Sequence, residues 1–195
     1  MALTLNGSSN TIAGLAVGGL PDGIVDTDML AADAVTAPKI GTKSYVSCAL
    51  LIDQKSQDTA GGTFTSGAHR VRDLNTEVFD PDNIVTLSSN EFTLASAGSY
   101  VIQWFAPCYK VDSNNSRLRE VTDGTIREGT NSFGHDGTGI QVHSEGMARV
   151  TQTGSKTYRI EHKSSATKAD NGFGVASGGI ANYDTYTTVT IWKEA

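Results

Sequence analysis

Tyr100-Val-Ile-Gln-Trp-Phe-Ala-Pro-Cys-Tyr-Lys-Val111 is the strongest strand candidate in the chain. Side chains alternate across a strand, so this stretch presents apolar residues on both faces. They are Tyr100, Ile102, Trp104 and Cys108 on one side, and Val101, Phe105, Tyr109 and Val111 on the other. Such a strand has to be covered on both faces. Because no long helical pattern supplies a second cover, we predict that a copy of the chain does so; a folded-back loop is the alternative.

The chain from residue 44 onward has the pattern of an all-β domain. Short apolar or alternating segments are separated by turn-forming residues, which favours a sandwich or a jelly roll. Residues 45–52 are apolar on both faces, like the stretch above. The expected strands are Tyr45–Ile52, His69–Leu74, Ile84–Leu87, Glu91–Leu94, Tyr100–Val111, Arg117–Val121, Gly139–Val150, Thr157–His162 and Tyr186–Lys193.

Residues 1–41 differ in composition from the rest. They contain no Phe, Tyr or Trp, whereas all six Phe, all six Tyr and both Trp follow them. A segment without large side chains needs a partner, or its own copies, to bury apolar surface. Val25–Ala31 and Val35–Gly41 form a short repeat with one apolar anchor each, Leu30 and Ile40. We expect an extended or partly helical segment whose anchors point at an axis shared by identical chains; a flexible leader is the alternative.

Charge and cysteine content narrow the class of protein. The formal net charge of −6 gives no basic surface for nucleic acid or for an anionic membrane. No apolar run is long enough to span a bilayer, and the start of the chain lacks the pattern of a signal peptide. Cys48 and Cys108 each lie in an apolar strand-like run, which favours buried free thiols. A single disulfide between them is the alternative.

Several motifs resemble a known family. Glu91-Phe-Thr-Leu-Ala-Ser-Ala-Gly-Ser-Tyr-Val-Ile-Gln-Trp104 resembles the hallmark of C1q/TNF-like jelly rolls, and Tyr186–Lys193 looks like the terminal strand of that family. Residues 158–165, followed by Gly172-Phe-Gly174, are similar to the versions found in bacteriophage tail fibres. The leader repeat resembles the tandem units of tail-fibre shafts. The resemblance divides the chain into an N-terminal shaft or attachment segment, 1–41, and a jelly-roll head, 44–195.

The resemblance implies a homotrimer of ten-stranded jelly rolls, with inner sheets packed around a three-fold axis. It places the first and last strands side by side, and the Tyr100 strand next to the last. Cys48 and Cys108 are then separated by one strand, too far apart for a disulfide. It also implies attachment to tail or baseplate proteins through residues 1–41. The residues expected at the trimer interface are Leu30, Ile40, Phe105, Tyr109, Val111, Tyr186 and Trp192.

The sequence gives little sign of catalysis. It contains no zinc-protease, serine-hydrolase or phosphate-loop motif, and we expect no catalytic residue, metal site or cofactor. Glu120, Asp123 and Glu128 are close in sequence, so a glycan depolymerase with paired carboxylates is a minority alternative. Gly134-His135-Asp136-Gly137 can hold a metal or a base, but such a pair is more typical of a loop tip. We expect His162 to be a hydrogen-bonded interior or interface residue.

Binding has better support, because loops rich in Asn, Ser, Asp and Gly with interleaved aromatics offer hydrogen bonds and stacking surfaces. With the resemblance, they predict a non-enzymatic trimeric tail-fibre protein in the phage virion, made in the bacterial cytoplasm, that recognises a bacterial surface glycan or protein. The alternatives are a C1q-like soluble binding module or lectin, and a virion decoration protein. The residues expected to contact the receptor are Asn114, Asn115, Arg117, Asn131, Phe133, His135, Asp136, Asp170, Asn171 and Tyr183.

Overall fold

The computed structural model describes residues 4–6, 11–13 and 44–195. The chain divides into two units, Met1–Thr42 and Lys43–Ala195. In the first unit, β1 (Thr4–Asn6) and β2 (Thr11–Ala13) form an antiparallel pair. The expected shaft repeat, with Leu30 and Ile40, lies outside the described residues. Among the described residues, no helix combines the length and the apolar character that crossing a membrane requires.

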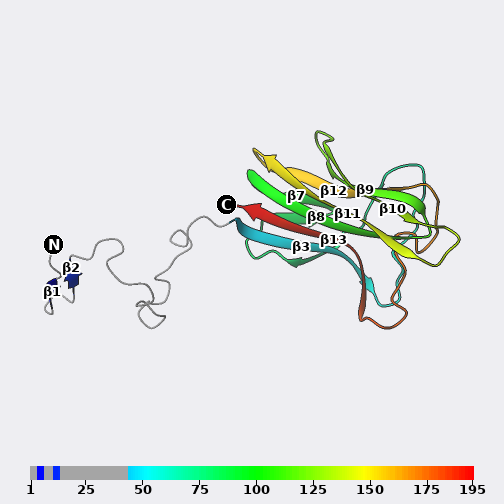
Figure 1. Ribbon diagram of the computed structural model, residues 1–195, viewed down its shortest axis with the longest axis horizontal. Helices are drawn as coiled ribbons and strands as arrows, with labels where there is room; N and C mark the ends of the chain where they lie inside the picture. The colour runs from blue at the N-terminus through cyan, green and yellow to red at the C-terminus, as the bar shows by residue number, and fades with distance from the viewer. Residues whose placement is uncertain (1–3, 7–10, 14–43) are drawn as a thin grey trace. The chain divides into compact units, whose positions relative to one another are not determined.

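The second unit is an all-β sandwich of two antiparallel sheets (Figure 1). The five-stranded sheet has the order β11, β8, β13, β3, β5, with β11 spanning Gln141–Gln152, β8 Gly98–Tyr109, β13 Tyr183–Glu194, β3 Tyr45–Ser56 and β5 Thr76–Phe79. The six-stranded sheet has the order β10, β9, β12, β7, β6, with β4 also beside β12. Its bounds are Ile126–Gly134, Asp112–Glu120, Lys156–Ser164, Glu91–Leu94, Val85–Ser88 and, for β4, Arg70–Val71.

The strand order confirms the neighbours that the C1q/TNF resemblance implied. The first long strand of the head, β3, pairs with the last, β13, and β8 pairs with the other side of β13. Because β13 lies between them, Cys48 on β3 and Cys108 on β8 are not bonded, and both are free thiols. Cys108 is buried, whereas Cys48 is only half-buried. Residues 44–195 contain eleven strands, one more than expected if the two-residue β4 is counted.

The main core fills the space between the sheets. From β8 it receives Tyr100, Ile102 and Trp104, all fully buried, as the alternation predicted. The Trp104 indole donates a 2.9 Å hydrogen bond to the Ser116 hydroxyl of the opposite sheet. The same ring lies directly against Gly146 of β11, where an added Cβ would overlap it. The sheets are therefore joined by a large apolar ring with a defined polar contact.

A smaller core cluster closes one end of the sandwich and corrects one expectation. Val111 lies beyond the end of β8 and is completely buried with Phe64, Cys108 and Phe173 of its own chain, so it is not on the outward face with Phe105. The chain turns at Lys110, whose φ is 53°, and this turn breaks the alternation that had placed Val111 outward. The apolar side chain is therefore covered from within one polypeptide.

Tyr186 also differs from its expected environment. It is buried by loops of its own chain: its hydroxyl donates to the Thr59 carbonyl at 2.7 Å, and its ring lies against Gly174. Gly174 has a φ of 144° and leaves no space for a Cβ at this contact. Here the folded-back loop, rather than a second subunit, covers an outward side chain of β13.

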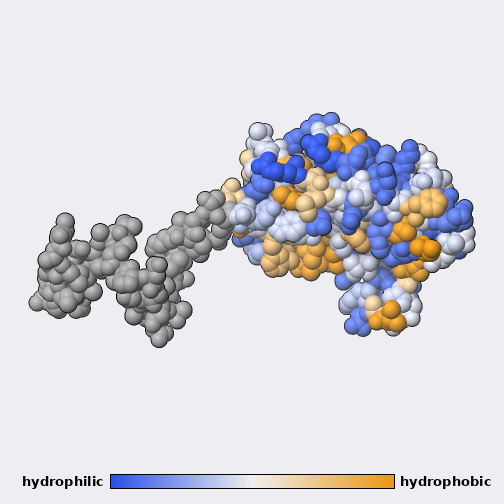
Figure 2. Space-filling model, viewed as in Figure 1, coloured by the Kyte–Doolittle hydropathy of each residue, from blue (hydrophilic) through white to orange (hydrophobic). Residues whose placement is uncertain are grey.

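The remaining outward side of the five-stranded sheet is apolar and open in the single chain. The register pairs Phe105 with Thr188, and Trp192 with both Val101 and Cys48, so all of these side chains share one side. In Figure 2, orange surface gathers along the lower edge of the head, beneath β3. We call this surface the apolar face; it comprises Val46, Cys48, Leu50, Phe79, Val101, Phe105, Met147 and Trp192.

Two expected loops are strands instead. Residues 112–116, which fall between two expected strands, extend the expected strand 117–121 toward the N-terminus as part of β9, and residues 130–134 belong to β10, which the sequence pattern did not predict. The alternating burial along β9 is regular, but three of its four buried residues, Asn114, Ser116 and Glu120, are polar. Burial of polar groups hides the apolar alternation on which strand prediction depends. In contrast, the expected strand at residues 69–74 is reduced to Arg70–Val71.

Candidate functional site

An open groove of about 820 Å³ lies at one end of the six-stranded sheet. Three neighbouring strands, β9, β10 and β12, form it, and the loop with Ser66, Gly67 and His69 borders it. Its lining is polar except for Phe133, whose side chain is 61% exposed. The lining residues are Ser66, Gly67, His69, Ser113, Asn114, Asn115, Asn131, Ser132, Phe133, Lys163, Ser164 and Ser165.

Strand register places the groove side chains in two rows. Asn115 of β9 is opposite Asn131 of β10 on one side and Lys163 of β12 on the other. Two residues further along β9, Ser113 is opposite Phe133. Partners in register project on the same side of a sheet, and positions two apart share that side. One row thus carries two amides and an ammonium group, and the next carries an aromatic ring.

The residues between these rows point inward and hold the strands together. Asn114 is only 5% exposed; its amide nitrogen donates to the carbonyls of Asp112 and Ser132, and its Oδ1 lies 3.0 Å from His162 Nε2. His162 is completely buried, as the sequence predicted. Burial, with the positive charge of Arg72 nearby, lowers the pKa of His162 well below its ordinary value. The neutral imidazole is therefore the form that supports the groove.

Next to the groove, arginines surround a buried carboxylate. Glu161 of β12 forms ion pairs with Arg117, Arg119 and Arg159, at 2.6, 3.4 and 2.7 Å. Although burial favours the neutral acid, the bonds and charge of Arg117 and Arg159 hold the pKa of Glu161 below its ordinary value. Arg117, expected to contact a receptor, is thus committed to a partner in its own chain.

His69 and Lys163 set the charge of the groove itself. Burial, together with the nearby cations Arg117 and Lys163, lowers the pKa of His69. His69 is therefore uncharged at neutral pH, and Lys163 carries the positive charge of the groove.

The structure brings four of the ten expected contact residues to the groove: Asn114, Asn115, Asn131 and Phe133. Asn114 lines it only from below, because its amide is fully used in the sheet. Three others are elsewhere. Asp170 and Asn171 lie on a loop packed against residues 62–64, and Tyr183 is exposed at the start of β13.

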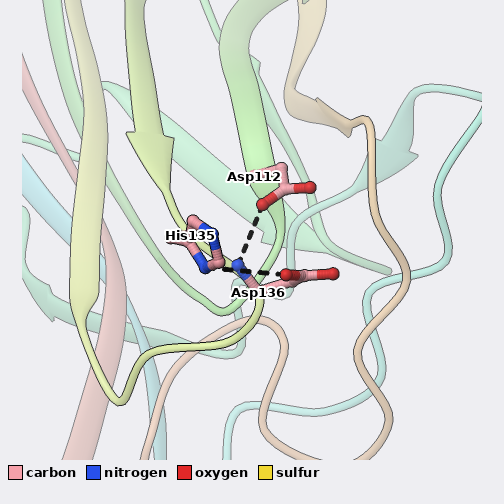
Figure 3. A group of neighbouring side chains, drawn as sticks. All are labelled: Asp112, His135 and Asp136. Atoms are coloured by element: carbon pink, nitrogen blue, oxygen red, sulfur yellow. Dashed lines mark hydrogen bonds and ion pairs between the residues drawn. The ribbon is translucent and has the colours of Figure 1, made fainter.

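His135 and Asp136 belong to a small polar cluster with Asp112 (Figure 3). The Asp136 N–H donates to Asp112 Oδ1 at 2.9 Å, and the Gly137 N–H donates to His135 Nδ1 at 2.9 Å. Asp136 Oδ1 lies 3.6 Å from the same imidazole nitrogen. Asp112 Oδ1 and His135 Nδ1 thus help to close the turn after β10. The cluster lies beyond Phe133, whose ring meets that of His135 edge-on at 6.3 Å.

Of the three carboxylates considered for glycan cleavage, Glu120 and Asp123 lie together at a small pocket of about 160 Å³, where Lys156 Nζ contacts both of them, at 3.5 and 2.8 Å. Glu128 does not line this pocket. Glu120 is buried and points inward, where it accepts the N–H groups of Thr122 and Asp123 at 2.8 and 2.9 Å. Glu128 is opposite Arg117 and therefore projects from the outward side of the sheet. Paired carboxylates on either side of a glycosidic bond need a common cleft. The geometry gives Glu120 the structural task of holding a turn.

Sequence reasoning missed much of the groove, including Ser66, His69, Lys163, Ser164 and Ser165. The signal for Lys163 was present, because alternation in residues 157–163 places it on the outward side of the strand. The serines and His69 come from segments distant in sequence and meet only through the pairing of β9 with β12 and through the loop before β4.

No protein-family model matches the sequence, and a search of curated proteins finds no match either. Solved structures similar to the chain include the globular domain of zebrafish complement 1qA protein, with 13% identity, a TM-score of 0.45, and coverage of 75% of this chain and 95% of that one. Murine APRIL at pH 8.5 has 9% identity, a TM-score of 0.48 and coverage of 75% and 98%. PRD1 vertex protein P5 has 15% identity, a TM-score of 0.44 and coverage of 78% and 100%. Because these TM-scores are below 0.5, the fold and the site rest on the geometry described above.

Proposed function

We propose that the protein is a non-enzymatic, trimeric phage tail-fibre protein whose head binds a glycan receptor on the bacterial surface. The observation that carries this proposal is the groove, where the exposed ring of Phe133 lies beside a row of amide and ammonium groups. An aromatic face for the apolar side of a sugar, next to hydrogen-bonding groups for its hydroxyls, suits a carbohydrate. The tail-fibre assignment rests on the sequence resemblance of the head motifs and of residues 20–41.

The apolar face supports the trimeric part of the proposal. It places Phe105, Trp192 and Leu50 together on one side of the five-stranded sheet, and Tyr109 has the same orientation on β8. A contiguous apolar surface of this kind is typical of a protein interface. Two further copies of the chain, related by a three-fold axis, would cover it. The groove belongs to the other sheet, so a trimer would present three grooves to a surface, and their weak contacts would add through avidity.

Glycan binding is tested with the purified full chain on an array of bacterial surface polysaccharides. We expect binding to a subset of glycans and its loss in Phe133→Ala, which removes the exposed ring. Ile126→Ala is the matched control, because Ile126 is also an exposed apolar residue of β10 but does not line the groove. Unchanged binding by Phe133→Ala, or no binding to any glycan by the native chain, would overturn the proposal.

The assignment to a tail fibre has its own test. Purified protein added to host cells is expected to occupy receptors and to reduce adsorption of the phage that encodes it. A decoration protein without a receptor role would leave adsorption unchanged. Light scattering at micromolar concentration is expected to give the mass of a trimer, and a stable monomer would contradict the assembly on which avidity depends.

A further inference from the structure

The groove differs in charge from the rest of the protein. The chain has 21 acidic and 15 basic residues, yet the twelve residues lining the groove include Lys163 and His69 and not a single Asp or Glu. Any negative charge that reaches this surface meets no like charge from the lining. Sites for neutral sugars gain from charged acceptors, such as carboxylates, for sugar hydroxyls; the lining of this groove contains serine and asparagine oxygens but no carboxylate.

Lys163 supplies the positive charge that the groove offers to a ligand. It is exposed on β12, directly opposite Asn115, and within the described residues its ammonium group makes no ion pair. The nearest carboxylate on its own strand, Glu161, already has three arginine partners. The charge of Lys163 is therefore not neutralised by its surroundings.

The amides next to Lys163 also favour a ligand that accepts hydrogen bonds. The Asn115 amide nitrogen donates to the Gly129 carbonyl at 2.9 Å and to Asn131 Oδ1 at 3.2 Å. This fixes Asn131 with its oxygen toward Asn115 and leaves its amide nitrogen for a ligand. The row of Asn131, Asn115 and Lys163 thus ends in a free amide donor at one side and an ammonium donor at the other.

We propose that the groove is specific for an anionic glycan, whose carboxylate or phosphate group binds at Lys163, while Asn131 at the other end of the row donates to a sugar oxygen and a sugar ring stacks on Phe133. This inference rests on the proposed function and names its ligand class. Asn131 and Phe133 are two residues apart on β10, about 7 Å, whereas Lys163 lies two strands away on β12, roughly 10 Å from Asn131. That spacing suits an acidic group and a stacked ring on neighbouring sugar units.

Two matched pairs of glycans test the proposal with the full chain by titration calorimetry. Polygalacturonate oligomers, which carry carboxylates, are compared with their carboxyl-reduced form, and phosphomannan oligomers with their dephosphorylated form. We expect the acidic member of at least one pair to bind about tenfold more tightly than its neutral member. The pair that shows the difference identifies the acidic group. Salt near 1 M, where charges are screened beyond about 3 Å, is expected to remove most of this advantage.

The Lys163→Gln variant is expected to lose the preference for the acidic member while keeping affinity for the neutral one. Its control is Arg127→Gln, which removes the same charge from an exposed position of β10 outside the groove. Equal affinity for acidic and neutral members, or an unchanged preference in Lys163→Gln, overturns the inference. If the chain binds glycans on the array but none of the acidic probes, the inference also fails while the proposed function stands. Failure on the array as well overturns both.

Discussion

The two outward surfaces of the sandwich are built on opposite rules. On the five-stranded sheet, the apolar face presents Phe105, Trp192 and other apolar side chains, with the charged Glu145 and Arg149 on the edge strand β11. On the six-stranded sheet, the same outward positions carry Arg117, Glu161 and Lys163. Each sheet buries its inner side in the common core, so the core does not require this difference. The proposed function accounts for the contrast: the apolar face would contact further copies of the chain, and the groove side would contact water and a glycan.

Among the substitutions that test this contrast, we expect the largest effect when the apolar face is made polar, because the oligomeric state then changes. Phe105→Asp places a charge at an outward position, where the Phe105 ring stacks on His143 at 4.3 Å and not on the core. We expect the variant to fold but to be monomeric, because an unpaired carboxylate in an apolar interface is strongly unfavourable. Light scattering measures the mass, and circular dichroism checks the fold.

Ile126→Asp is the control for that substitution, because it adds the same charge to the outward side of the six-stranded sheet. It is expected to remain trimeric. If Phe105→Asp were trimeric too, the apolar face would not be the interface.

Inside the sandwich, the close contact between Gly146 of β11 and the Trp104 ring of the neighbouring strand β8 is expected to give the next largest effect. In Gly146→Ala the new methyl group overlaps the buried Trp104 ring, which has to shift together with its bond to Ser116. We expect a loss of about 3 kcal/mol in the free energy of unfolding, measured with urea. Gly154→Ala meets no atom within 4 Å and is expected to leave stability nearly unchanged. Similar stabilities for the two variants would show that the ring has room to move.

On the polar surface, the buried carboxylate of Glu161 is expected to matter more than exposed ones. Glu161→Gln leaves Arg117, Arg119 and Arg159 without their shared partner, and we expect a loss of about 2 kcal/mol. Glu128→Gln neutralises an exposed residue on the same side of the sheet and serves as the control. Urea unfolding compares the two variants, and an equal, small effect would mean that the arginines are satisfied by water.

The smallest expected effect is on the pH dependence of stability, and it comes from His162 beneath the groove. The unfolded chain protonates His162 as the pH falls below about 6.5, but the folded chain does not, because burial lowers the pKa of this imidazole. The contribution of His162 to the free energy of unfolding is therefore fully present above that pH. Below it, this contribution declines by up to about 1.4 kcal/mol per pH unit. We expect His162→Gln to lose less stability than the native chain between about pH 7.5 and 5.5. An identical pH dependence of urea unfolding in both proteins would contradict this assignment.

The sequence predicted the apolar strands and their neighbours but not the polar ones. Alternation found the Tyr100 strand with its two faces, because both consist of apolar residues. It found the end of β9 at residues 117–120 but missed β10 and the start of β9, where Asn114 and Ser116 are buried through hydrogen bonds instead of apolar contacts. Such burial depends on partners from other strands, which no local pattern contains. Val111 was misplaced for a related reason, since a single residue in a left-handed conformation reverses the face that follows.

For the candidate site, residue type was a better guide than position in the chain. Asn115, Asn131 and Phe133 were chosen for their chemistry and do line the groove. Lys163 was left out of the expected contacts, because nothing in the sequence shows that β12 pairs with β9. The site exists only once three strands, distant in the chain, are brought into register.

Alternation along β9 and β12 has a consequence for how related proteins can diverge. Residues 113, 115 and 163 project outward, while 114, 116 and 162 secure the strands from the inside. Under the proposed function, residues 113, 115 and 163 can therefore change as the receptor changes, without loss of the contacts that hold the strands together. Homologues adapted to different hosts are expected to vary at the first set and to be nearly invariant at the second.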